Sequence, residues 1–261
     1  MRKISILGCG WLGKPLGLEL INLNFIVKGS TTTQEKLQEF SQLGIEPFLI
    51  NLDEIDTVYK EFLNSEIVIV SLTSKNINGF ENLITQIENS SIKKVIFISS
   101  TSVYPNNNQI VSEDATLISS PLVEIESLFT NNFNFQTTIV RFAGLFGYNR
   151  KPGNFFSNGR LIPNPDGFVN MIHRDDCISI LTEIIKKEVW GEVLNACADT
   201  HPKRRDYYTK TKADIGNELP TFIESASTEF KIIANKKLKS ILNYKFKYGN
   251  LMEIDYNSPF I

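Results

Sequence analysis

The stretch that decides the fold opens the chain, where residues 3–13 read KISILGCGWLG. Its first five residues form a short apolar run of the length expected for a buried strand. Gly8, Gly10 and Gly13 follow at once with GxGxxG spacing, and residues 11–22 then show the pattern of an amphipathic helix. A strand, a glycine-rich turn and a helix in this order predict the start of a βαβ unit.

This turn predicts a binding site for the pyrophosphate of a dinucleotide. The first glycine permits the tight turn, the second lets the backbone approach the pyrophosphate, and the third lets the helix pack closely on the strand. The N–H groups at the helix start have no partner within the helix and face the anion. The turn residues expected at the site are Gly8, Gly10, Trp11, Leu12 and Gly13.

Two other interpretations of the turn are open. It could be a purely structural glycine turn, although its position between strand and helix favours a dinucleotide site. Residues 8–14 also match the GxxxxGK start of a phosphate-binding P-loop, but Pro15 stands where that loop needs a Ser or Thr to bind Mg²⁺. The sequence therefore disfavours kinase or NTPase chemistry.

Short apolar runs alternate with amphipathic stretches of helical length along most of the chain, which is typical of a parallel sheet built from βαβ units. The expected strands are 3–7, 25–28, 46–50, 67–72, 94–98, 137–141 and 193–196, and the expected helices are 11–22, 34–42, 55–63, 80–88, 122–129 and 175–187. We predict an α/β fold with a doubly wound parallel sheet (Rossmann) and a small C-terminal substrate lobe.

The predicted domains follow this pattern. Residues 1–148 should form the dinucleotide-binding Rossmann core, and residues 149–261 a mixed region in which core elements return at about 168–197. The stretch 147–167, rich in Gly, Asn and Pro, and the tail after Thr200 interrupt the rhythm, and such insertions often hold substrates. Aromatic and basic residues alternate at 244–248, and we expect a half-buried edge strand protected by lysines rather than a nucleic-acid surface.

The composition limits the classes of partner. The chain has 27 Lys and Arg against 29 Asp and Glu, so its net charge of −2 gives no general attraction to nucleic acid or acidic membranes. Cys9, Cys177 and Cys197 are far apart in the sequence and argue for reduced thiols, and two histidines without metal-binding spacing predict no metal. With no targeting signal or long apolar span in view, we expect a cytoplasmic protein with a small-molecule substrate, no nucleic acid and no membrane partner.

The segment after the second predicted strand bears on the choice between NAD and NADP. That strand should end near Lys28, where an NAD-specific site places an acid against the ribose hydroxyls. No Asp or Glu occurs between Glu19 and Glu35, so a 2′-phosphate would meet hydroxyls and a cation. We add Lys28, Ser30, Thr31 and Thr32 to the expected cofactor site and favour NADP, with NAD as the alternative. The competing interpretation is that residues 30–33 cap the next helix.

A resemblance covers nearly the whole chain. It rests on the glycine turn, on SSTSVY at 99–104, on VRFAGLFG at 140–147, on IHRDD at 172–176 and on GEVLN at 191–195. With these motifs the sequence resembles the extended short-chain dehydrogenase/reductase family of sugar epimerases, dehydratases and reductases. The resemblance implies NAD(P)-dependent chemistry on a sugar or nucleotide-sugar-like carbinol or ketone. The family usually has GxxGxxG, and Leu7 stands at its first glycine, which indicates an atypical branch.

The resemblance also implies site residues. Ser100 matches the residue that hydrogen-bonds the reacting oxygen of the substrate, and Leu72, Thr73 and Ser99, near the ends of two strands, are expected at the cofactor. A YxxxK pair should follow on the next helix, but residues 118–126 read ISSPLVEIE and contain neither Tyr nor Lys. Alignment on the later Glu of the family places Ile118 and Leu122 at the two positions, and alignment on its Pro places Leu122 and Glu126 there.

The missing pair leaves two functions open. If the protein is an enzyme, another group must move the proton, and the candidates are Ser100, Tyr104, Glu113, Asp114 and His173, of which we name Ser100 and Tyr104 as catalytic. The alternative is a catalytically impaired dinucleotide-binding protein with a regulatory or structural role. We expect His173 to be structural, with Asp175 or Asp176 capping the following helix, and Tyr208 and Lys212, which also have YxxxK spacing, to be a coincidence. The resemblance further suggests a homodimer through the helix at 122–129.

Overall fold

The computed structural model describes residues 2–54, 59–157, 159–224, 228–259 and 261. The chain forms two compact units between which it passes repeatedly. Unit 1 consists of Met1–Ser99, Ile118–Val140 and Leu181–Val193, and unit 2 consists of Ser100–Leu117, Arg141–Ile180 and Leu194–Ile261.

A seven-stranded sheet has the order β11-β7-β5-β4-β1-β2-β3, so the chain builds outward from β1 in both directions. The strands are β1 (Lys3–Leu7), β2 (Ile26–Thr31), β3 (Glu46–Leu49), β4 (Ile67–Val70), β5 (Lys94–Ser100), β7 (Gln136–Phe142) and β11 (Val193–Ala196). The sheet is parallel, with Ile4 opposite Val27 on β2 and Ile67 on β4. Central strands such as β4, with the sequence IVIV, are buried throughout, as expected where both faces of a sheet are covered. The predicted α/β, doubly wound Rossmann fold is confirmed.

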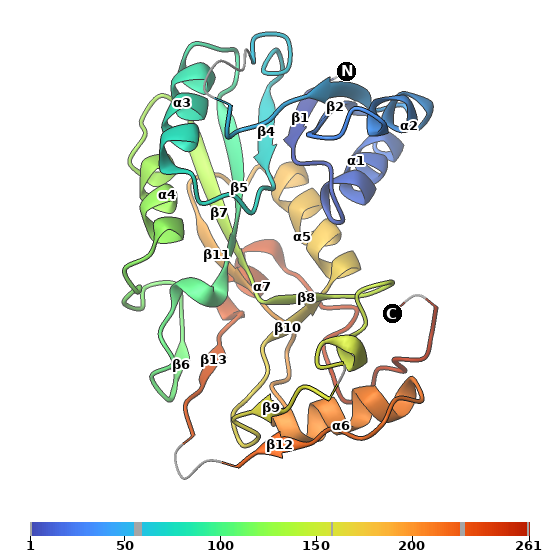
Figure 1. Cartoon of the computed structure of the whole chain (residues 1–261). Coiled ribbons are helices and arrows are strands. Elements are labelled where there is room, and N and C mark those ends of the chain that lie inside the picture. Colours follow the sequence, from blue (N-terminus) through green and yellow to red (C-terminus); the bar gives the residue numbers. More distant parts are fainter. Residues whose placement is uncertain (1, 55–58, 158, 225–227, 260) are drawn as a thin grey trace. The chain divides into compact units, whose positions relative to one another are not determined.

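Helices cover both faces of this sheet in unit 1. They are α1 (Gly13–Asn22), α2 (Lys36–Gln42), α3 (Ile77–Glu88) and α4 (Pro121–Thr130), while α5 (Arg174–Lys186) runs from unit 2 into unit 1. Figure 1 shows α1 and α2 on one side of the strands and α3 and α4 on the other. The rings of Phe97 on β5 and Phe129 on α4 stack with centroids 4.7 Å apart, and Phe80 on α3 meets Phe129 edge-on at 6.1 Å.

Unit 2 combines three two-stranded sheets with short helices. The sheets pair β6 (Gln109–Val111) with β13 (Lys231–Ile233), β8 (Gly144–Phe146) with β10 (Met171–His173), and β9 (Ile162–Pro163) with β12 (Phe222–Ile223); the helices are η1 (Thr101–Val103), η2 (Pro152–Asn154), α6 (Arg204–Asp214) and α7 (Lys236–Leu242). Phe146, Tyr207 and Tyr256 lie at the centre of its apolar core. In the described part of the chain, every helix is too short or too polar to cross a bilayer.

All seven predicted strands and most predicted helices are present, with shifts at their ends. The predicted helix at 55–63 is an exception: residues 55–58 lie outside the described residues, and residues 60–63 form a turn. The predicted end of the second strand at Lys28 is wrong, because β2 continues to Thr31, which pairs with Leu49 on β3.

The predicted edge strand at 244–248 is also wrong, since this segment is irregular. Its polar groups are held by Asp176 instead. The Asp176 carboxylate accepts hydrogen bonds from the backbone N–H of Lys247 at 2.8 Å, from that of Tyr248 at 3.0 Å and from the Tyr244 hydroxyl at 2.8 Å. Asp176 itself lies inside the first turn of α5 and is buried, so its carboxylate supports the tail.

Candidate functional site

Two of the three glycines in the turn after β1 are required by close packing. Gly8 has φ +101°, and a Cβ there would lie 2.4 Å from the carbonyl oxygen of Ser71 after β4. A Cβ at Gly13, the first residue of α1, would lie 2.3 Å from the carbonyl oxygen of Gly8. Real side chains do not tolerate such distances, so α1 can pack against the turn only with glycine at both positions.

The middle glycine is different, because it faces open space. A Cβ at Gly10 would meet no atom of the described residues within 4 Å, and its φ lies outside the left-handed region. Helix α1 has Leu12 as its N-cap, no side chain capping its end and no acid in its first turn. The N–H of Lys14 donates to the Gly10 carbonyl oxygen at 3.1 Å and Pro15 has no N–H, so the N–H groups offered to an anion such as a diphosphate are those of residues 10–13, beside the open space at Gly10.

Ser30 on β2 supports the turn. The N–H of Gly8 donates to the Ser30 hydroxyl oxygen at 2.9 Å, and the N–H of Cys9 donates to the Ser30 carbonyl oxygen at the same distance. Ser30 is buried, and this bracing gives it a role that the sequence did not indicate. Leu72 lies beside the turn as well, since its Cδ2 would be 3.0 Å from a Cβ at Gly8.

Lys28 occupies a place that differs from the predicted one. Its side chain is buried, its ammonium donates to the carbonyl oxygen of Glu61, and it lies 5.5 Å from the ring centroid of Phe48. The Lys28 ammonium therefore has its contacts inside unit 1. The expected contact of Lys28 with a 2′-phosphate lacks support. Lys14 at the helix start is likewise occupied, in an ion pair of 2.7 Å with Glu39.

The hydroxyls at the end of β2 remain available at the surface. Thr32 is exposed, and the Thr31 hydroxyl oxygen accepts from the N–H of Thr33 at 3.1 Å. Helix α2 begins later, at Lys36, with Glu35 as its N-cap. Residues 30–33 thus do not cap that helix.

Thr73 and Ser99 follow two neighbouring strands of the sheet. Thr73 is exposed after β4, whereas Ser99 is buried near the end of β5. The Ser99 hydroxyl lies 2.5 Å from a carboxylate oxygen of Glu126 on α4, a residue that is itself buried. This bond joins strand to helix within unit 1 and occupies the hydroxyl that the sequence assigned to the cofactor.

The two named catalytic candidates lie in unit 2, in different surroundings. Ser100 is half-buried, and its hydroxyl oxygen accepts from the N–H of Ser102 at 3.1 Å. Tyr104 is 1% exposed. Its hydroxyl donates to the side-chain oxygen of Asn195 at 2.8 Å and accepts from Arg141 at 2.6 Å. Burial raises the pKa of Tyr104, so its phenol stays protonated inside this network.

The remaining proton candidates are held by neighbours in unit 2. A carboxylate oxygen of Glu113 accepts from the N–H of Asn195 at 2.8 Å. A hydrogen bond from Ser112 lowers the pKa of the exposed Asp114. His173 is fully buried at the end of β10, with its ring centroid 3.9 Å from that of Tyr248. His173 thus has the packing of a structural residue.

The two alignments place the Tyr and Lys positions at Ile118, just before α4, and at Leu122 and Glu126 on α4, whose sequence is PLVEIESLFT. Leu122 packs against the apolar core of unit 1, Ile118 is 39% exposed and Glu126 is bonded to Ser99. Ile118 and Leu122 have no titratable group, and the Glu126 carboxylate accepts the hydrogen bond of Ser99. The YxxxK spacing at Tyr208 and Lys212 falls on α6 of unit 2.

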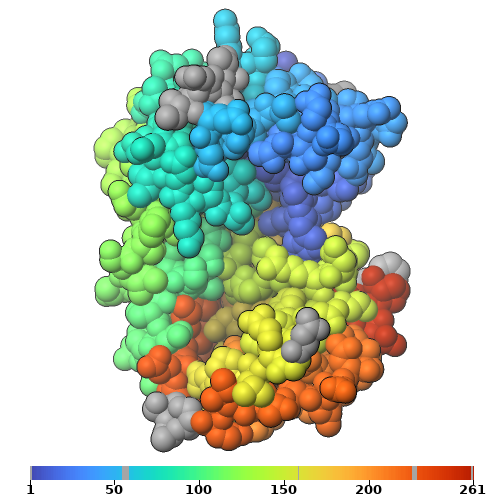
Figure 2. Space-filling model, viewed as in Figure 1, coloured from blue at the N-terminus to red at the C-terminus, as the bar shows by residue number. Residues whose placement is uncertain are grey.

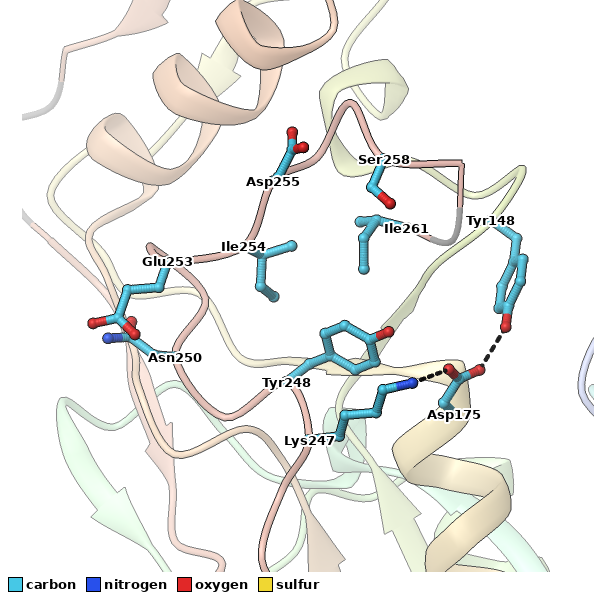
Figure 3. A pocket seen from close by; sticks show the side chains of 10 residues that line it. All are labelled: Tyr148, Asp175, Lys247, Tyr248, Asn250, Glu253, Ile254, Asp255, Ser258 and Ile261. Carbon is cyan, nitrogen blue, oxygen red and sulfur yellow. Dashed lines mark hydrogen bonds and ion pairs between the residues drawn. The ribbon is translucent and has the colours of Figure 1, made fainter.

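A cavity of about 600 Å³ in unit 2 was not indicated by any single motif. Its walls include Tyr148, Asp175, Lys247, Tyr248, Ile254 and Ser258. Figure 3 shows Tyr148 and Lys247 directed at Asp175, with distances of 2.9 Å from the phenol and 3.2 Å from the ammonium to the carboxylate. Tyr148 has a φ of 58°, which is unusual for a residue other than glycine. Burial and the bond to Asp175 raise the pKa of Tyr148, so its phenol stays protonated and donates to that carboxylate.

Known proteins are similar to this chain in sequence. Residues 3–123, which include the glycine turn, match the family described as the NAD binding domain of 6-phosphogluconate dehydrogenase. Protein YeeZ of Escherichia coli (strain K12) is 29% identical over 270 residues, covering 95% of this chain and 97% of the relative.

Solved structures extend the comparison to the whole chain. A short-chain dehydrogenase/reductase superfamily protein from Agrobacterium tumefaciens with bound NAD is 16% identical, covers 97% of this chain and 95% of its own, and gives a TM-score of 0.78. The likeness shows that this chain and that protein share a fold. UDP-glucuronic acid 4-epimerase from Bacillus cereus, in complex with UDP-glucuronic acid and NAD, is 20% identical, covers 98% of both chains and has a TM-score of 0.80. The resemblance found in the sequence motifs is thus confirmed in the fold.

Proposed function

We propose that the protein binds a nicotinamide dinucleotide at its glycine turn and transfers a hydride between it and a sugar-like carbinol or ketone. One observation carries the first part: Gly8 and Gly13 leave no room for a side chain, whereas the space at Gly10 is open beside an uncapped helix end. The match of residues 3–123 to an NAD binding domain supports it independently.

We propose NADP as the preferred cofactor. Bound there, the nicotinamide ring would donate or accept the hydride. Thr31 and Thr32 offer hydroxyls at the end of β2, and no carboxylate occurs in the sequence between Glu19 and Glu35 to repel a 2′-phosphate. With Lys28 buried, this preference rests on hydroxyls and on the lack of an acid in that stretch.

Ser100 is our candidate for holding the reacting oxygen of the substrate. Its hydroxyl oxygen accepts from Ser102, so its own proton can be donated to a substrate oxygen. Tyr104 is buried between Arg141 and Asn195, and we assign it a positioning role near Ser100 rather than contact with substrate.

The cavity at Asp175 is our candidate for holding the substrate. Its volume of about 600 Å³ suits a small molecule, and its phenol, ammonium and carboxylate can hydrogen-bond hydroxyls. The UDP-glucuronic acid in the complex of the Bacillus cereus epimerase supports a sugar-like substrate class. A cytoplasmic location and a homodimer through α4 remain predictions.

A second function is favoured by a specific observation. Helix α4 carries neither Tyr nor Lys, and Leu122, at one of the pair's positions in both alignments, packs into the core. This supports a catalytically impaired protein that binds the dinucleotide for regulation or stability.

The test is calorimetric titration of the purified protein with NADPH, NADP, NADH and NAD, followed by a panel of sugars and carbonyl compounds monitored by nicotinamide absorbance. We expect binding, tighter for the NADP pair, and slow turnover of one substrate class. Absence of binding for all four nucleotides contradicts both functions, and binding without turnover favours the second. An NAD preference contradicts the role given to Thr31 and Thr32. Ser100→Ala should slow turnover, whereas the exposed neighbour variant Ser102→Ala should not.

A further inference from the structure

A second cavity, of about 350 Å³, lies within unit 2. It is formed by residues 154–157 and 159–160, from the end of η2 onward, and by the C-terminal part of α6 with the loop that follows. Its walls include Asn154, Phe156, Ser157, Arg160, Lys212 and Thr221. Figure 2 shows the first segment, in yellow, directly against the second, in orange. Every residue in its walls belongs to unit 2, so this cavity can be argued independently of the glycine turn.

Lys212 is the unusual residue in this cavity. Only 7% of it is exposed, yet no hydrogen bond or ion pair joins its ammonium to any residue that the structure describes. Other lysines nearby are paired: Lys210 on the same helix lies 2.6 Å from Asp214, and Lys203 lies 3.2 Å from Asp166. Most of the Lys212 side chain is buried and the residue lines the cavity, so its ammonium offers a positive charge there to an anionic ligand.

A second cation stands at the rim of the cavity. Arg160 is exposed, and its guanidinium lies 5.6 Å from the ring centroid of Phe156. The walls carry one acid, Glu218, which is exposed, so the two cations exceed the negative charge of the lining. A phosphate group, which carries between one and two negative charges at neutral pH, complements such a pair.

The rest of the lining is polar. Ser157 and Thr221 provide hydroxyls, Asn154 and Asn217 provide amides, and the Asn217 amide nitrogen already donates to the Asn154 side chain at 3.0 Å. Such groups bind the hydroxyls of a polyol, and the volume lies at the small end of ligand cavities.

We propose that this cavity binds a small phosphorylated polyol of the sugar phosphate class, with the phosphate on Lys212 and Arg160 and the hydroxyls on Ser157, Thr221 and Asn154. The site goes beyond the proposed dinucleotide chemistry and does not depend on it. It gives unit 2 a ligand that could act as a substrate portion or as an effector, and the binding test does not need to distinguish the two.

The experiment is calorimetric titration of the full chain with glucose 6-phosphate, glucose and inorganic phosphate. We expect glucose 6-phosphate to bind, inorganic phosphate to bind more weakly and glucose to bind least. Lys212→Met should lower the affinity for glucose 6-phosphate at least about tenfold, and Arg160→Gln at least about threefold, since each removes a charge-assisted contact. The matched control, Lys203→Met, removes a lysine near the start of the same helix but outside the cavity walls and should bind normally.

Three results would overturn the proposal. The first is no binding of glucose 6-phosphate to the unaltered protein. The second is equal binding of glucose and glucose 6-phosphate, which would remove the role of the cations. The third is unchanged affinity in Arg160→Gln and Lys212→Met, which would place the phosphate elsewhere, for example at the glycine turn. If Lys212→Met does not fold, Arg160→Gln at the exposed rim decides the matter alone.

Discussion

Adding one methyl group at two glycines of the same turn should have opposite effects. At Gly10 a Cβ meets no described atom within 4 Å and the backbone is not left-handed, so Gly10→Ala should change the free energy of unfolding by less than about 0.5 kcal/mol. The methyl group occupies the space that we assign to the diphosphate. Loss of one charge-assisted amide contact costs about 2–3 kcal/mol, or roughly 30- to 160-fold in Kd for NADP.

At Gly13 the balance is reversed. A Cβ there would lie 2.3 Å from the carbonyl oxygen of Gly8 and 3.2 Å from a methyl group of Ile6, so backbone must move. Overpacking of this kind costs about 1–3 kcal/mol. Gly13→Ala should therefore lower Tm by several degrees even without nucleotide, since each kcal/mol shifts Tm by about 2–4 °C in a chain of this size.

Differential scanning fluorimetry without nucleotide and calorimetric titration with NADP measure the two quantities separately. The pair of variants is informative because each serves as the control for the other. Wild-type affinity in Gly10→Ala would refute the approach of the diphosphate to this turn. An unchanged Tm in Gly13→Ala would refute the close packing of α1 on Gly8.

Asp176→Ala should lower the free energy of unfolding by about 2–4 kcal/mol in urea denaturation, because three hydrogen bonds to a buried carboxylate are lost. Proteases should then cut the variant near residues 244–248. Protease resistance equal to that of the wild type would contradict this. The hydrogen bond from Lys94 is the main cause that lowers the pKa of Glu188 from 4.5 to about 2. Glu188 therefore contributes stability above pH about 4.5, and this contribution is lost as the pH falls toward 2. We expect wild type and Glu188→Gln to differ in free energy of unfolding by less than about 1 kcal/mol, because the group is largely exposed. This difference should shrink as the pH falls from 4.5 toward 2 in urea titrations. A difference that stays constant over this range would contradict the lowered pKa. Tyr148→Phe should raise the KM for a substrate found in the panel about tenfold and leave the Kd for NADP unchanged, because the phenol lies in the wall of the substrate cavity; an unchanged KM excludes the phenol from substrate binding.

The sheet could be predicted because its strands are locally distinctive. Continuous apolar runs such as 67–70 are buried on both faces, as is typical of the central strands of a parallel sheet. The end of β2 was missed because Thr31 is polar and continues the strand only through its pairing with Leu49. Pairing of this kind depends on a distant segment and leaves no periodic signal in the sequence.

The prediction of a strand at 244–248 was wrong because of contacts with a segment that is distant in the sequence. Alternation of aromatic and basic residues predicts a strand, but the backbone N–H groups there are taken by Asp176, which is about 70 residues away in the chain. Lys28 was assigned to the cofactor because it is a cation at the right spacing. Its burial against Phe48 depends on the third dimension and could not be read from the spacing.

The glycine turn is the part of the site that sequence predicts best, because its chemistry depends on local backbone. Both cavities of unit 2 escaped prediction, although the stretches that form them were recognised as insertions. Tyr148 and Lys247 both contact Asp175, and Lys212 and Arg160 line the same cavity. Each pairing joins segments at least 50 residues apart, and no motif spans such a distance.

The most direct measurement is a crystal structure of the protein grown with NADP. The account predicts diphosphate oxygens about 2.7–3.2 Å from the backbone nitrogens at the start of α1 and beside Gly10, with the 2′-phosphate near Thr31 and Thr32. A nucleotide bound away from this turn, or a diphosphate without contact to these N–H groups, would contradict it.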